Sequence, residues 1–182
     1  MTQAMNNEEK IQYLMDRAAI EDCLARYCHG VDRGDEELLR SAYWPDAIDD
    51  HIFIKGGREE AIKWIMDVVR EQEQAMHAIS NVLIRIDGDE ARVQTYYNSY
   101  HRIRGRSGAP KDLTMAGRYL DRMEKRNGEW RIAERKVVMD WWRNYSDSAD
   151  WERGLFGTKF QVGQRGAADP SAALFGDRLR RP

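Results

Sequence analysis

The chain has 182 residues, 42% of them hydrophobic and 33% charged, which is typical of one globular domain with a tail. Its 29 basic and 31 acidic residues leave a formal net charge of −2, which provides no field to attract nucleic acid or anionic lipid. No apolar run approaches the roughly 18 residues of a membrane span, and the N-terminus lacks the pattern of a secretory signal. We therefore expect a cytoplasmic protein with no nucleic-acid or membrane partner.

Helical periodicity dominates the first part of the chain. Apolar residues recur at helical spacing over residues 9–29, and Gly30 predicts the end of that helix. Its two cysteines, Cys23 and Cys28, are better explained as reduced core thiols than as a disulfide or a zinc site. Asp35 has the position of an N-cap for a short helix over residues 36–43.

The next segment changes from strand to helix. Residues 45–54 carry isoleucines in alternation, which predicts a short strand. Gly56 and Gly57 are expected to break it, and residues 58–74 have the pattern of a second amphipathic helix.

Strand patterns follow up to about residue 142. Four β-type segments are predicted at residues 76–86, 90–104, 113–125 and 129–142. Tight turns join the first to the second and the third to the fourth, at residues 87–89 and 127–128. Helices followed by an antiparallel meander predict an α+β fold rather than a parallel βαβ one.

Three regions are expected along the chain. Residues 1–8 form a flexible N-terminus, residues 9–142 form the folded domain, and residues 143–182 form a C-terminal extension. The extension is predicted to pack on the domain or on a neighbouring subunit, with the pairs Leu155–Phe156 and Leu174–Phe175 as its anchors.

Asp32 and His77 carry side chains that can exchange protons, although neither is distinctive alone. Asp32 follows the first predicted helix, where a carboxylate usually caps a turn. His77 opens the first long strand, where a lone histidine is more often a hydrogen-bonded structural group. Pattern alone does not show that residues so far apart in the sequence meet.

Short motifs in chain order resemble a known family. They are RAAIED at residues 17–22, Tyr27, GVDRG at 30–34, MH at 76–77, SN at 80–81, GRY at 117–119 and GEWRIA at 128–133. The string resembles SnoaL-like members of the nuclear-transport-factor-like superfamily, which includes scytalone dehydratase, hexachlorocyclohexane dehydrochlorinase and bile-acid dehydratase. This resemblance implies a cone-shaped α+β barrel, with N-terminal helices packed on a strongly curved, mainly antiparallel mixed sheet. It also implies a homo-oligomer, with a trimer favoured over a dimer.

The resemblance also assigns roles to four residues. Asp32 would orient His77, and the imidazole of His77 would remove a proton from a substrate carbon. Tyr27 and Arg135 match positions where relatives place a tyrosine and an arginine, which would assist the leaving group and stabilise negative charge. From pattern alone, Tyr27 is equally well a core aromatic and Arg135 an outward-facing strand residue. No metal and no cofactor is implied.

Further polar residues are candidates for the pocket lining: His51, Lys55, Tyr97 and His101. The Asp49-Asp50-His51 cluster suggests a metal site, but adjacent residues on a strand point to opposite faces, so we do not expect one. Tyr97 and His101 share strand parity with Thr95 and Ser99, which gives that face a polar and aromatic character suited to a ligand pocket. An exposed strand end is the alternative for His101.

Together these expectations describe a cofactor-independent lyase. Its substrate would be small, hydrophobic and aromatic or alicyclic, and dehydration would be the reaction. Retro-aldol C–C cleavage or a ketosteroid-type isomerisation in the same pocket is the first alternative. A non-catalytic binding module or an oxygenase small subunit is the second, because the same fold serves such roles.

Overall fold

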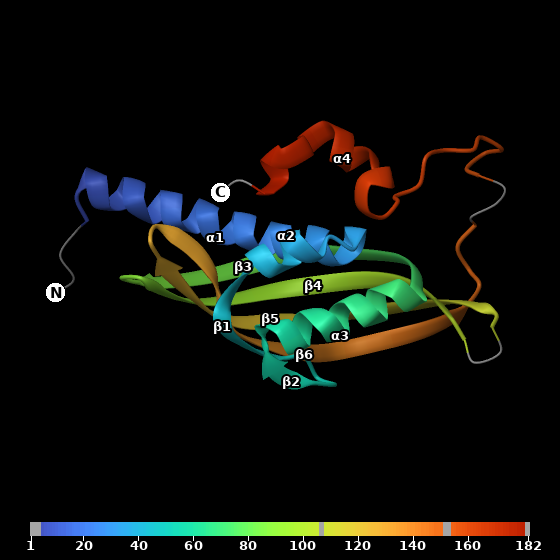
Figure 1. Cartoon of the computed structure of the whole chain (residues 1–182), viewed down its shortest axis with the longest axis horizontal. Coiled ribbons are helices and arrows are strands. Elements are labelled where there is room, and N and C mark those ends of the chain that lie inside the picture. The colour runs from blue at the N-terminus through green and yellow to red at the C-terminus, as the bar shows by residue number, and fades with distance from the viewer. Residues whose placement is uncertain (1–4, 106–107, 151–153, 181–182) are drawn as a thin grey trace.

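The computed structural model describes residues 5–105, 108–150 and 154–180. Helices cover one face of a six-stranded sheet (Figure 1), whose strand order is β2-β1-β6-β5-β4-β3. Neighbouring strands are antiparallel except β1 and β6, which are parallel. The sheet does not close on itself. The expected α+β fold with a mixed, mainly antiparallel sheet is therefore confirmed, as an open cone.

Helix α1 (Asn7–Arg33) is longer than its apolar pattern predicts at both ends. At its start, Asn6 accepts a hydrogen bond from the backbone of Glu9, whose side chain returns one to Asn6, forming a capping box. Within the described part of the chain, no helix is long and apolar enough to cross a bilayer.

The prediction that Gly30 ends the first helix is wrong. Gly30 lies inside α1, where a Cβ atom would come within 2.7 Å of the Leu39 nitrogen, so glycine permits a close approach of the next helix. The chain leaves the helix at Gly34, which has the left-handed φ of 65° typical of such ends. Asp32 consequently sits in the last turn of α1 and not in a loop beyond it.

The next elements are α2 (Glu36–Ser41), β1 (Tyr43–Asp50), β2 (Lys55–Gly57) and α3 (Arg58–Glu71). Asp35 caps α2 as predicted, accepting from the Leu38 N–H. The predicted strand over 45–54 is shorter than expected, because the chain turns after Asp50 and Ile52 takes a positive φ of 66°. Gly56 does not break a strand; it pairs with Asp49 in a two-stranded ladder.

The four predicted long strands are all present: β3 (Gln72–Asp87), β4 (Glu90–Arg104), β5 (Pro110–Arg126) and β6 (Glu129–Ser146). The bounds of β4 are as predicted, β3 and β5 are longer at both ends, and β6 is longer at its C-terminal end. Bulges interrupt the β3–β4 and β5–β6 ladders, and such bulges bend strands. At Gly117 a Cβ atom would lie 2.0 Å from the Val138 carbonyl oxygen. Only glycine allows β5 and β6 to approach this closely at the bend.

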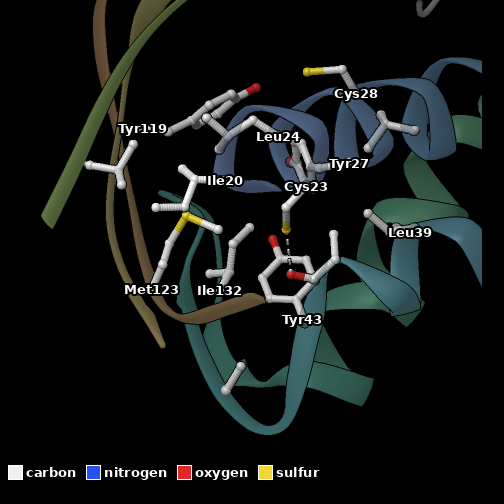
Figure 2. Packing of buried hydrophobic residues seen from close by; sticks show 14 of the residues in the cluster. Ile20, Cys23, Leu24, Tyr27, Cys28, Leu39, Tyr43, Tyr119, Met123 and Ile132 are labelled. Atoms are coloured by element: carbon white, nitrogen blue, oxygen red, sulfur yellow. Dashed lines mark hydrogen bonds between the residues drawn. The ribbon is translucent and has the colours of Figure 1, made fainter. Parts of the chain in front are cut away.

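The core lies between α1 and the sheet (Figure 2). Ile20, Leu24 and Ile132 are each at most 1% exposed, and burying a side chain of this size contributes about 1.5–3 kcal/mol. Cys23 and Cys28 are free, buried thiols in this layer, as predicted.

The C-terminal segment returns over α1 and α2 (Figure 1) and contains η1 (Gly166–Ala168), α4 (Pro170–Phe175) and η2 (Gly176–Arg180). Polar contacts hold it: Arg33 lies 3.5 Å from Asp169, and Gln74 donates to the Gly163 carbonyl at 2.8 Å. Of the predicted apolar anchors, Leu155, Phe156 and Leu174 are 62%, 96% and 71% exposed, whereas the ring of Phe175 meets that of His29 on α1 edge-on, with 6.5 Å between centroids. Their packing on a neighbouring subunit stays a prediction.

Candidate active site

A cavity of about 780 Å³ lies between the helices and the inward-facing side of the sheet. Aliphatic and aromatic side chains form most of its lining, as in sites that take small hydrophobic molecules. Polar groups reach it from both ends of the sheet, namely Gln72, His77, Ser99 and His101 from β3 and β4, His51 from the turn after β1, and Asn144 from β6.

Asp32 and His77 meet at this cavity, in the contact that the resemblance implies. Asp32 Oδ1 lies 2.6 Å from His77 Nδ1, and Asp32 Oδ2 accepts the backbone N–H of His77 at 2.8 Å. An ionised carboxylate only accepts, so Nδ1 carries the proton and the Nε2 lone pair is left free. Within the described residues, Nε2 has no hydrogen-bond partner. The pair thus presents a basic nitrogen at the cavity.

His101 lies beside His77, with 5.2 Å between the ring centroids. Its nitrogens are both occupied, Nδ1 with Gln72 Oε1 at 3.0 Å and Nε2 with the Ser99 hydroxyl at 3.0 Å. Burial, reinforced by the neighbouring His77, lowers the pKa of His101 to about 4. His101 lines the cavity, and the exposed-strand alternative is wrong because only 7% of the residue is exposed. His101 therefore offers a neutral ring edge.

Tyrosines form the inner wall of the cavity. Tyr97 stacks on Tyr119 with 4.6 Å between centroids, and Tyr27 meets Tyr119 edge-on at 5.5 Å. Burial raises the pKa of Tyr97 to about 12 and the pKa of Tyr27 further above its usual value. Both phenols stay protonated, so they can donate hydrogen bonds but do not act as bases. Tyr27, which is also a core aromatic at 2% exposure, and Tyr97 line the cavity; Tyr119 was known only as part of a family motif.

Arg135 does not line this cavity, which corrects its predicted place. It makes two hydrogen bonds to Asp121, at 2.8 and 2.7 Å, and both side chains are fully buried. Its guanidinium carbon lies 4.1 Å from the centroid of Tyr27 and 4.2 Å from that of Tyr119. Arg135 therefore packs against Tyr27 and Tyr119 without reaching the cavity. Asp121 was missed, although it alternates with the inward-facing Tyr119.

His51 reaches the cavity from the turn after β1, not from a strand as predicted. Its Nδ1 lies 3.2 Å from Asp49 Oδ1, and its ring centroid is 5.2 Å from that of Trp64. Alternation along a strand places Asp49 and His51 on the same face. This pattern could have predicted their contact. Within the described residues, no group of three or more His, Cys, Asp or Glu side chains is arranged to hold a metal ion.

Lys55 lies outside the cavity, contrary to prediction. Its side chain is 69% exposed, with Nζ 3.9 Å from Asp50 Oδ2. It borders a separate surface depression of about 750 Å³. The reason is that the chain turns after Asp50, and the edge strand β2 directs Lys55 to the outer side.

Fold and cavity together define a cone-shaped α+β domain that brings an Asp–His pair to an apolar cavity. The SnoaL-like domain family matches residues 12–136, which is most of the chain, and the protein belongs to this family. No curated protein is significantly similar to the chain.

Solved structures share the fold. A type 2 hexachlorocyclohexane dehydrochlorinase is 21% identical, covering 80% of this chain and 99% of its own, with a TM-score of 0.71. The type 3 enzyme from Novosphingobium barchaimii LL02 is 22% identical, covering 79% and 99%, with a TM-score of 0.67. A candidate scytalone dehydratase from Novosphingobium aromaticivorans DSM 12444 is 21% identical, covering 80% and 98%, with a TM-score of 0.67. At such identities the similarity establishes the fold.

Proposed function

We propose that this protein is a cofactor-independent lyase in which His77 abstracts a proton from a carbon atom of a small cyclic substrate. One observation carries the proposal: Asp32 accepts both the Nδ1–H and the backbone N–H of His77, which leaves Nε2 as a free base at the cavity. A positioned base of this kind typically contributes 10²- to 10⁴-fold to a rate.

The reaction follows from what each group can do. Nε2 takes the proton, the electrons of the broken C–H bond form a double bond, and the group on the neighbouring carbon departs with its bonding electrons. Asp32 stabilises the imidazolium that forms, as the carboxylate does in a Ser-His-Asp triad. Tyr27 donates a hydrogen bond to the departing atom, which stabilises developing charge in a cavity lined mostly by apolar side chains.

The cavity and the structural relatives support elimination from a ring. An aliphatic and aromatic lining and a volume of about 780 Å³ suit an aromatic or alicyclic molecule. Structures with the same fold carry the names of a hexachlorocyclohexane dehydrochlorinase and a candidate scytalone dehydratase. Both names denote removal of a small molecule from a cyclic substrate.

Two substrates test the proposal. Purified protein is incubated with hexachlorocyclohexane, followed by chloride release, and with scytalone, followed by loss of water in the mass spectrum. We expect turnover of at least one, abolished by His77→Ala and by Asp32→Asn with little change in melting temperature. His29→Ala is the control, because His29 lies outside this cavity. Activity that survives in both Asp32→Asn and His77→Ala would refute the assignment.

A further inference from the structure

A second carboxylate–imidazole pair serves the same cavity. Asp49 is fully buried, and its Oδ2 accepts the Tyr43 hydroxyl at 2.6 Å while Oδ1 faces His51 Nδ1 at 3.2 Å. Burial alone would raise the pKa of Asp49, but the hydrogen bonds from His51 and Tyr43 outweigh it and the pKa is lowered. Asp49 is therefore ionised, and both of its oxygens are used, as they are in Asp32.

Among the described side chains, Asp49 makes its hydrogen bonds to His51 and Tyr43. Arg135 lies close enough to affect Asp49, but its two hydrogen bonds go to Asp121. The charge of Arg135 thus acts on Asp49 without a hydrogen bond, and the oxygens of Asp49 contact His51 and Tyr43. The next charged residues along the chain, Asp50 and Lys55, pair with each other on the outer side. Trp64, the aromatic neighbour of His51, carries no charge.

The two imidazoles come from parts of the sheet that lie far apart in the strand order. His51 follows β1 and His77 lies on β3, with β6, β5 and β4 between them in the strand order. Four steps between strands span roughly 19 Å along the sheet, and its curvature brings both side chains to one cavity. The turn that carries His51 holds Ile52 at φ 66°, a costly conformation for a β-branched residue. Such conformations concentrate where a functional group must be presented.

We propose that His51 is a second catalytic residue, which donates the proton on its Nε2 to the departing group as His77 takes a proton from carbon. The bond to the departing atom breaks, that atom gains a proton, and His51 becomes neutral while His77 becomes an imidazolium. Solvent then restores both. Asp49 and Tyr43 are positioning residues, since they act through His51. The step deepens the proposed lyase function and rests on it.

Binding of 4-nitrophenol tests this donor without any turnover. Its phenolate oxygen imitates a departing oxyanion, and its absorbance reports ionisation. We expect the wild-type protein to bind the phenolate, and His51→Gln to raise its Kd about 10-fold or more, because a neutral amide then donates in place of the imidazolium. Asp49→Asn should act in the same direction. Asp50→Asn is the matched control, and its Kd should equal that of the wild type.

The possible results separate the two proposals. No phenolate binding by the wild type, an unchanged Kd in His51→Gln, or a loss confined to His77→Gln would each overturn the role of His51. Should Asp49→Asn unfold the protein, His51→Gln still decides, because His51 lies on a turn and glutamine retains a donor. The imidazole NMR signals of His51 should shift in Asp49→Asn but not in Asp50→Asn, because only Asp49 contacts the ring. Turnover that survives without His77 would refute the lyase proposal even where His51 binds the phenolate.

Discussion

His77 and His101 stand side by side on paired strands, with ring centroids 5.2 Å apart, but their hydrogen bonds differ. An ionised carboxylate holds Nδ1 of His77 and leaves Nε2 free. Neutral partners occupy both nitrogens of His101. The first arrangement produces a base supported by a negative charge, and the second produces a ring that is neutral near pH 7.

The partners of a histidine therefore decide its chemistry more than its place in a cavity does. By this criterion His51 belongs with His77, because a buried carboxylate holds its Nδ1. The carboxylates come from different elements, Asp32 from α1 and Asp49 from β1. Four predictions test the contrast between His77 and His101.

The largest effect is expected from replacing each histidine in turn by glutamine. His77→Gln should lower kcat/KM by about 10³-fold or more, since it removes the base. His101→Gln should lower it only about 10-fold, because it alters the packing beside the base. Steady-state kinetics with whichever of the two test substrates is turned over measures both values of kcat/KM. Equal losses would contradict the different roles given to His77 and His101.

The second effect is on stability against pH. An unfolded histidine has a pKa of about 6.5, whereas the pKa of His101 in the folded protein is lowered to about 4. Above the unfolded pKa, His101 is neutral in both states and the free energy of unfolding is fully retained. As the pH falls toward the folded pKa, only the unfolded histidine takes up a proton, so the free energy of unfolding decreases. This amounts to about 3 kcal/mol. Urea unfolding at several pH values should show a shallower acid loss in His101→Gln, and parallel curves would contradict the lowered pKa.

A third effect, about 10-fold in kcat, is expected for Tyr27→Phe. The change removes one hydroxyl donor from the cavity wall and keeps the ring that packs against Arg135. It separates assistance to the leaving group from proton abstraction, which belongs to His77. Rates that match the wild type would remove Tyr27 from the reaction, and an unchanged melting temperature serves as the control for packing.

The smallest effect is expected for Ser99→Ala. It removes the donor to His101 Nε2, which favours the neutral ring, so the pKa of His101 should rise. The change in kcat/KM should stay below about threefold, because His77 keeps its carboxylate. NMR titration of the imidazole follows the pKa. A loss as large as that of His77→Gln would mean that His101 takes part in proton transfer.

Local patterns predicted the elements well where near neighbours control them. The long strands and the cap at Asp35 follow from periodicity and from one side chain. Gly30 was misjudged because a glycine that permits helix packing has the same local sequence as one that ends a helix. The short strand was overextended past Asp50 because the turn there depends on pairing with β2.

Motif and periodicity were enough to assign the α+β class, the family and the candidate residues Asp32 and His77, because these signals lie within short stretches of chain. Contacts between distant segments were decided by folding. The last turn of α1 packs beside β3, so Asp32 reaches His77; β5 and β6 pair, so Asp121 captures Arg135 behind the tyrosines. A side chain's alternation indicates its face of the sheet, but the partner it meets depends on strand order and curvature.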